Sequence, residues 1–132
     1  MTAFSDYLEN KLLDGTLRNI AYTPVATTYV GLHTTATLDA NSGTEVTGGS
    51  YARTAVLAAG WGVPAGGSTS NLGIITFPTS TASWGTVTHF GIYDGSGGGA
   101  NLLYWGQLTI AKTVDSGDVF TFPIGNLTVS LD

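Results

Sequence analysis

The sequence predicts an all-β protein, a compact antiparallel β-sandwich or barrel-like domain of about seven strands with one short N-terminal helix. Short runs of apolar and β-branched residues alternate with clusters of Gly, Pro, Asn, Asp and Ser after residue 15. This spacing is typical of sandwiches and barrels. The length of 132 residues suits one domain with its own core. We therefore expect residues 1–132 to fold as a single unit.

The first segment is expected to form the helix, over about residues 3–14. Phe4, Leu8 and Leu12 recur every four residues and place an apolar stripe on one face. Gly15 indicates the C-terminal end. The helix either packs its apolar stripe on one end of the core or projects from the domain and binds a partner. Three residues at the start of this segment have side chains that can cap the helix: Thr2, Ser5 and Asp6.

Seven later segments have the composition of strands, because they are rich in Val, Ile, Thr and aromatic residues and are bounded by turn residues. They are residues 27–34, 51–56, 72–77, 86–93, 102–108, 119–122 and 126–131. In the last one, Leu127, Val129 and Leu131 alternate with polar residues, which predicts a strand with one solvated face. The Gly-rich segment 94–101 is expected to be a hairpin loop, and 115–118 a tight turn.

Charged side chains make up only 10% of the sequence, and the surface must be supplied largely by its 21 Thr and 19 Gly. Such a neutral surface is typical of a protein that is packed against neighbours. With four Lys and Arg in total and a net charge of −5, no basic patch can form. We therefore expect no nucleic-acid partner and no binding to an anionic membrane. A secretory signal and a transmembrane segment are not expected either, so synthesis is expected in the cytoplasm.

The residues capable of chemistry do not form a known catalytic or metal-binding motif. His33 and His89 each lie inside a predicted strand, and Ser83 and Asp94 flank His89 without a nucleophile-elbow pattern. The turn 115–118 holds two Asp but lacks the alternating carboxylates of a calcium loop. The sequence contains no Cys. We expect structural histidines, no enzyme activity, no metal and no cofactor.

Three tryptophans are candidates for packing or for contact with a partner. Trp105 lies inside a predicted strand and is expected in the core or in packing between sheets, and Trp84 precedes a strand and is expected to close one end of the core. Trp61 lies between glycines in the longest irregular stretch, residues 58–71, and either anchors a partner or folds back onto its own core. Five residues of this loop and of the N-terminal segment are the candidate partner contacts: Trp61, Val63, Pro64, Phe4 and Tyr7.

The segment from Ser83 to Asp94, S-W-G-T-V-T-H-F-G-I-Y-D, resembles a family of small virion proteins of tailed bacteriophages. Residues 51–53, 102–106 and 3–10 extend the likeness over nearly the whole chain. Members are labelled as tail fibre proteins or as capsid decoration (cement) proteins. The resemblance brings no catalytic motif with it and implies a non-enzymatic virion component.

Within that class, the single compact domain favours a decoration protein on the capsid surface. Such a protein would be made in the host cytoplasm, bind across subunits of the major capsid protein and stabilise the head, with other virion proteins as further contacts. We expect a homo-oligomer, a trimer or a dimer, whose repeated weak contacts add up by multivalency. The alternative is a tail fibre or tail-tip module that binds a host receptor or glycan, which the aromatic content and the Trp61 loop favour.

Overall fold

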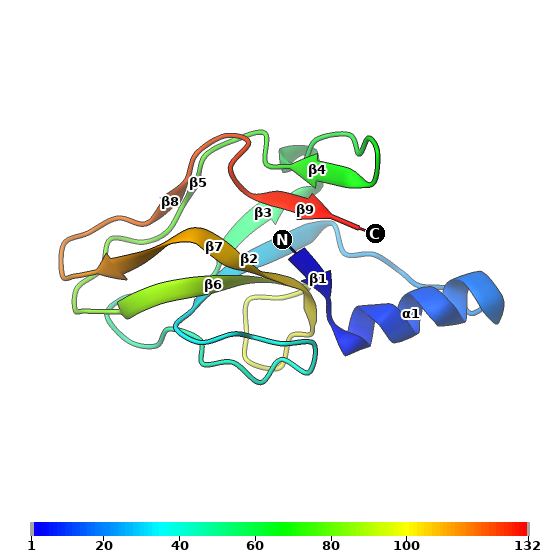
Figure 1. The fold of residues 1–132 in the computed structure, drawn as a ribbon, viewed down its shortest axis with the longest axis horizontal. Coiled ribbons are helices and arrows are strands. Elements are labelled where there is room, and N and C mark those ends of the chain that lie inside the picture. The colour runs from blue at the N-terminus through cyan, green and yellow to red at the C-terminus, as the bar shows by residue number, and fades with distance from the viewer. Residues whose placement is uncertain (1, 132) are drawn as a thin grey trace.

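The computed structural model describes residues 2–131 and confirms a mostly β fold with one short helix. Five strands form one antiparallel sheet in the order β1-β7-β6-β2-β3, and two small sheets pair β4 with β9 and β5 with β8 (Figure 1). The elements of the described residues are β1 (Thr2–Phe4), α1 (Asp6–Leu17), β2 (Thr27–His33), β3 (Thr54–Leu57), the 3₁₀ helix η1 (Ala58–Gly60), β4 (Ser68–Ser70), β5 (Ile75–Thr76), β6 (Gly85–Tyr93), β7 (Leu102–Val114), β8 (Thr121–Phe122) and β9 (Thr128–Ser130).

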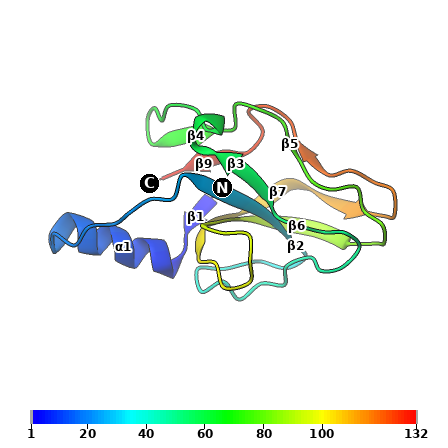
Figure 2. The ribbon, with the colours of Figure 1, turned by 180° about the vertical axis from the view of Figure 1, so that it is seen from behind.

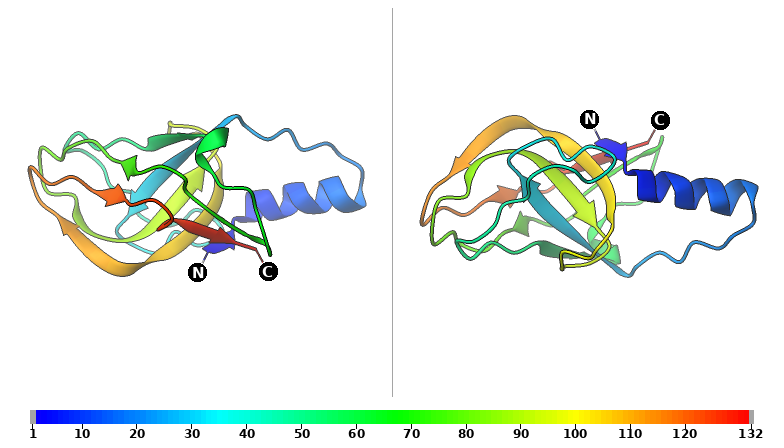
Figure 3. Two further views of the ribbon diagram at one scale, coloured as in Figure 1. Left: turned by 90° about the horizontal axis from the view of Figure 1, so that it is seen from above. Right: turned by 90° about the horizontal axis from the view of Figure 1, so that it is seen from below.

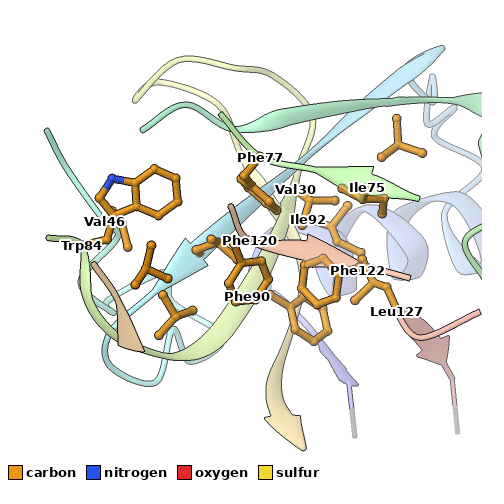
Figure 4. Packing of buried hydrophobic residues seen from close by; sticks show 14 of the residues in the cluster. Val30, Val46, Ile75, Phe77, Trp84, Phe90, Ile92, Phe120, Phe122 and Leu127 are labelled. Carbon is orange, nitrogen blue, oxygen red and sulfur yellow. The ribbon is translucent and has the colours of Figure 1, made fainter. Parts of the chain in front are cut away.

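The hydrophobic core lies between the five-stranded sheet and the two small sheets. Strands β2 and β6 alternate, so that Val30, Leu32, Phe90 and Ile92 point into it and are buried. Phe122 of β8 meets Phe90 from the opposite layer, with ring centroids 6.0 Å apart and the rings edge to face (Figure 4). Burial of these large side chains provides the main stabilisation of the domain.

The small sheets also join the edge of the large one, which gives the domain its barrel-like closure. The Thr2 hydroxyl of β1 donates to the carbonyl of Ser130 in β9 (3.0 Å) and accepts from the Ser130 N–H (2.9 Å). Strands β1 and β9, the first and last strands of the described residues, therefore lie side by side (Figures 1 and 2).

The helix begins later than the sequence predicts. Ser5 is the N-cap, and its hydroxyl accepts a hydrogen bond from the Leu8 N–H (3.2 Å). The predicted start at residue 3 is wrong because Thr2–Phe4 pair with β7 as strand β1. Phe4 therefore belongs to the sheet and not to the helical stripe.

The helix also ends later, at Leu17 and not at Gly15. The Arg18 N–H donates to the Asp14 carbonyl (3.1 Å), and the Arg18 guanidinium pairs with the Asp14 carboxylate (2.7 Å). These contacts extend the helix beyond Gly15. A glycine inside an exposed helix lowers the stability of the helix by only about 1 kcal/mol relative to alanine.

Each of the seven predicted strands corresponds to an observed one, although several ends differ. The strand predicted at 51–56 begins only at Thr54, the one at 72–77 is reduced to β5, and the one at 102–108 continues as β7 to Val114. The loop between β6 and β7 is the predicted hairpin connection. Strands β1 and β4, three residues each, were not predicted.

Helix α1 projects from the β body together with the connection that returns to β2 (Figure 3). We call residues 6–26 the arm. Leu8 is the buried residue of the helix, whereas Leu13 and Leu17 are exposed, the latter by 77%. The apolar stripe therefore covers the domain only near its first turn. None of the helices within residues 2–131 has the length and apolar character needed to span a membrane.

Candidate functional site

A polar cluster lies beside strands β2 and β6 of the large sheet. His33 and Tyr93 alternate with the core residues Leu32 and Ile92 and so point away from the core, whereas the Tyr51 ring packs on Phe77 and Trp84 at the border of the core.

The centre of the cluster is an ion pair in which Nε and Nη2 of Arg53 donate to the two carboxylate oxygens of Glu45, each at 2.8 Å. The Tyr51 hydroxyl donates to Glu45 (2.6 Å) and accepts from the N–H of Leu32 (2.9 Å). Tyr51 and Arg53 leave the β3 ladder to make these bonds, which explains the late start of that strand. We call Glu45, Tyr51, Arg53, Tyr93 and His33 the Glu45 cluster.

The cluster fastens two long loops to the sheet. The Arg53 guanidinium lies 3.5 Å from the centroid of the Tyr93 ring, a cation–π contact, and its Nη1 donates to the carbonyls of Gly95 and Gly97. The Tyr93 hydroxyl is hydrogen-bonded to His33 Nε2 (2.8 Å) and donates to Asn41 (3.2 Å). The loop before β3 and the β6–β7 loop are thereby held on one face of the sheet.

A glycine makes room for the ion pair. A Cβ atom on Gly31 would lie 2.7 Å from Glu45 Oε2 and 3.1 Å from the Tyr51 hydroxyl. A larger residue would therefore push the carboxylate out of its bonds. Gly31 lies in β2, so the sheet itself sets how closely Glu45 approaches.

Burial and hydrogen bonding set the protonation states of the cluster. Burial favours a raised pKa for the Glu45 carboxyl, but the hydrogen bonds from Arg53 and Tyr51 outweigh it and hold the pKa below its ordinary value. Burial lowers the pKa of His33 to about 4, with the charge of Glu45 opposing and that of Arg53 adding to the effect. His33 Nδ1 is buried without a hydrogen-bond partner, so the neutral ring is the form that fits.

The side chains that flank His89 in the sequence do not join it in a catalytic arrangement. His89 Nδ1 is hydrogen-bonded to the hydroxyl of Thr88 (2.8 Å). The Asp94 carboxylate accepts from the backbone and side chain of Asn101, and the Ser83 hydroxyl accepts from the N–H two residues further on. Among residues 2–131, no three His, Cys, Asp or Glu side chains gather as metal ligands.

Trp61 packs on its own domain, and its contact with a partner stays a prediction. Its ring lies against the hydrophobic core, and Nε1 donates to the hydroxyl of Thr28 (3.0 Å). The stretch 58–71 is an ordered hairpin, because Trp61 bridges to Asn71 and the Gly62 N–H donates to the Ser70 carbonyl (2.9 Å).

The other candidate contact residues lie at two separate places. Val63 and Pro64 are exposed on the first half of the hairpin, between the bridges Trp61–Asn71 and Ala65–Ser68, and Val63 is 93% exposed. Phe4 and Tyr7 are half-buried at the base of the arm, where the Phe4 ring packs on Tyr104 with centroids 5.6 Å apart. Contact of these residues with a partner stays a prediction.

Replacing Trp61 with alanine is expected to destabilise the domain by about 2 kcal/mol, because it removes ring packing and the bond to Thr28. Trp61→Phe, which loses mainly the hydrogen bond, should lower the free energy of unfolding by only about 1 kcal/mol. Urea denaturation of the two variants measures both values. An unchanged midpoint for Trp61→Ala would show that the ring is free to serve as a partner anchor.

The other two tryptophans lie on opposite faces of the large sheet. Trp84 is buried, as expected, and its Nε1 donates to the Gly49 carbonyl (2.9 Å). The core position predicted for Trp105 is wrong. Trp105 is opposite Gly91 on the outer face of the sheet, where it is half-buried and donates to Asp39 (2.8 Å).

Sequence reasoning missed Glu45 and Arg53 as paired residues. They are eight positions apart and belong to no known motif, so their types alone did not indicate a pair. One signal could have pointed to Arg53. Residues 51–53 and the end of β6 are two of the segments that carry the family resemblance. The structure brings both segments to the same face of the sheet.

Comparison with known proteins gives one clear result. A family model described as Podophage GP4 fiber I protein gp80 matches residues 3–130, which include the arm and nearly the whole β body. No curated protein matches the chain. The chain belongs to the podophage GP4 fiber I protein gp80 family and is a fibre-like structural protein of a phage virion.

Proposed function

We propose that the protein is a non-enzymatic component of a tail fibre. The observation that carries this proposal is the match of a fibre family over residues 3–130. The small size of the domain was the argument for capsid decoration, but size suits a fibre component equally well. The family match does not support a location on the capsid surface, so we favour attachment to the tail over capsid decoration.

The Glu45 cluster supports a structural role. Its charged groups are occupied by one another and by backbone carbonyls of the Gly95–Gly97 loop. The cluster's geometry stabilises two loops on the sheet, which is what a durable virion component requires. An ion pair whose groups bond to one another and to a loop in this way holds structure in place.

The arm supports attachment to another virion protein. An isolated helix of 12 residues is marginally stable in water, and most of the stability of a helix in a protein comes from packing of its apolar face. In α1 the face that bears Leu13 and Leu17 is exposed. We infer that a neighbouring protein of the tail covers these two leucines and completes the packing of the helix.

Localisation in the particle tests the proposal directly. Cryo-electron microscopy of virions, combined with labelling by an antibody against this protein, should place the protein on fibres of the tail. Density or label confined to the head surface would overturn the proposal and favour capsid decoration instead. Binding of a host receptor or glycan stays a prediction, which a glycan array and an adsorption-competition assay with purified protein test.

Charged substitutions on the arm should abolish incorporation into virions. The double variant Leu13→Asp, Leu17→Asp should lower the free energy of unfolding by no more than about 1–2 kcal/mol, because both side chains are exposed and the cost comes from the lower helix propensity of Asp and its place near the helix C-terminus. Particles produced with this variant should contain little of the protein by immunoblot. Leu38→Asp, an exposed leucine in the loop before β3, is the matched control and should be incorporated normally. Normal incorporation of the double variant would contradict attachment through the arm.

A further inference from the structure

Strand β7 has an open edge over its second half. Strand β1 pairs with β7 only at residues 104–106, and no other strand of the described residues lies on that side of β7. We call residues 107–113 the β7 edge. Their side chains are exposed except for Leu108, which is half-buried. An open edge of this kind offers a row of backbone N–H and C=O groups to another strand.

A bulge disturbs the pairing of β7 on its other side. Where β6 and β7 pair, Thr88 alone faces residues 108–111 of β7. Such an insertion leaves the extra residues unpaired and bends the strand, and β7 is strongly curved (Figure 3). Residues 108–111 therefore lack regular strand pairing on both sides.

A groove lies beside the β7 edge, between this strand and the β8–β9 segment. It has a volume of about 360 Å³, and residues 107–110 of β7 form one of its walls. The opposite wall contains β8, which pairs with β5 on one side only and not with β7. The floor belongs to the hydrophobic core, because Phe90, Phe122 and Leu127 line the groove and are at most 6% exposed (Figure 4).

One apolar side chain on the wall of the groove has no cover. Leu108 packs against the core, whereas Ile110 lines the same groove and is 73% exposed. The hydrophobic effect therefore favours an occupant that brings apolar side chains to Ile110 and to the floor.

The charge at the groove favours a carboxylate. Lys112 is the one charged residue of β7 and of the groove lining, and it forms no ion pair within residues 2–131. Its cross-strand partner is the core residue Val87, and its ammonium lies 5.7 Å from the centroid of the Phe120 ring. The acids that follow in the sequence, Asp115 and Asp118, belong to the next turn, where the Asp118 carboxylate accepts from the Asp115 N–H (2.9 Å).

We propose that the β7 edge binds an extended segment of another protein, in which apolar side chains alternate and a carboxylate lies at the Lys112 end. The open backbone selects an extended chain, because only a strand presents N–H and C=O groups at the matching spacing. The floor and Ile110 select apolar side chains on one face of that strand, and Lys112 selects the carboxylate.

The position of Lys112 also argues against a second copy as the occupant. A lysine on an open edge disfavours pairing with the same edge of another copy, because the pairing brings like charges towards each other. An antiparallel segment from another protein would continue the line of β1, which pairs with β7 in that direction. Its N-terminal end would then lie at Lys112.

Binding of synthetic peptides to the purified protein tests this inference. The probe is the peptide Glu-Val-Thr-Val-Thr-Val with blocked ends and a dye at its C-terminal end, and fluorescence anisotropy measures its affinity. One comparison peptide has Lys in place of Glu, and another has Pro in place of the second Val, which removes a donor and interrupts strand pairing. The Glu peptide should bind about fivefold more tightly, or better, than either comparison peptide.

Two substitutions on the β7 edge test where the peptide binds. Lys112→Glu should reverse the preference, so that the Lys peptide binds more tightly than the Glu peptide. Ile110→Asp should weaken binding of the Glu peptide by roughly tenfold, because it places a charge in the apolar contact. Lys11→Glu makes the same charge change on the arm and is the matched control, so it should leave both affinities unchanged. An unchanged thermal midpoint shows that a variant is folded.

Hydrogen exchange followed by mass spectrometry locates the site. The amides of residues 107–113 should exchange more slowly when the Glu peptide is bound. Absence of binding at millimolar peptide, equal binding of the proline peptide, or protection confined to other segments would each overturn the inference. Self-association of the protein that Ile110→Asp abolishes would overturn it as well and assign the edge to a second copy. These outcomes do not depend on the location of the protein in the virion, so they are separate from the test of the fibre proposal.

Discussion

Arg53→Ala is expected to lower the free energy of unfolding by about 3–5 kcal/mol, the range for breaking one side of a buried ion pair. The Arg53 side chain is only 6% exposed and makes two bonds to Glu45 and two to backbone carbonyls, besides its contact with the Tyr93 ring. Its removal leaves the Glu45 carboxylate without its cation. Chemical denaturation at neutral pH, followed by tryptophan fluorescence, measures the loss.

Arg18 provides a control within the same chain. It forms an ion pair with Asp14 at 2.7 Å, close to the 2.8 Å of Arg53 and Glu45, but the Arg18 side chain is 69% exposed. Arg18→Ala should therefore change the free energy of unfolding by less than about 1 kcal/mol. If both alanine variants have the same small effect, the Glu45 cluster does not hold the fold together.

A double substitution separates the ion pair from its surroundings. In Glu45→Gln, Arg53→Met, neither charge remains buried, so part of the stability lost in Arg53→Ala should return. A double variant that is as unstable as Arg53→Ala would show that the Arg53 bonds to the β6–β7 loop dominate.

The sequence was informative where a strand is long and its residues alternate. β2 and β6 lie within one residue of their predicted ranges, because each is a run of seven or more residues rich in Val, Ile, Thr and aromatic residues, and the core residues alternate throughout β2 and, after a bulge near Thr88, in the second half of β6. β1 was missed because Phe4, Leu8 and Leu12 suit a helix as well, and only the pairing of Thr2–Phe4 with β7 decides between the two states. That pairing spans about a hundred positions and leaves no local signal.

The Glu45 cluster could not be predicted from the sequence for a related reason. Glu45 lies in a loop, and Arg53 follows Tyr51 at the point where the chain departs from the ladder of β3. Their pairing depends on Gly31 and Tyr93, which belong to β2 and β6.

The protein is expected to lose stability in mild acid because of His33. The pKa of His33 is about 4 in the folded protein, against an ordinary value of 6.5. The unfolded chain therefore binds more protons between these values, and stability falls as the pH drops through this window. The expected loss relative to neutral pH is about 1.4 kcal/mol at pH 5.5 and about 2.5 kcal/mol at pH 4.5.

Burial is the main cause of the lowered pKa of His33, and among the charges that face the ring the largest effect, that of Glu45, opposes it. Tyr93 bonds its Nε2, Arg53 and His89 disfavour a second positive charge, and Glu45 alone favours one. The pKa of Glu45 is lowered, so its own contribution is present above its ordinary pKa and is lost only below it. The effect of His33 therefore dominates between pH 6.5 and about 4.5.

His33→Gln tests the assignment, because glutamine can still bond to Tyr93 but does not titrate in this range. The free energy of unfolding of this variant, measured by denaturant at several pH values, should vary less with pH between 6.5 and 4.5 by about 2.5 kcal/mol. His89→Gln is the control. Burial also lowers the pKa of His89, but its ring is only half-buried and is bonded to Thr88, so this variant should retain most of the wild-type pH dependence. A His33→Gln variant with the wild-type profile would show that His33 is not held neutral by the fold and would assign the acid sensitivity to the carboxylates.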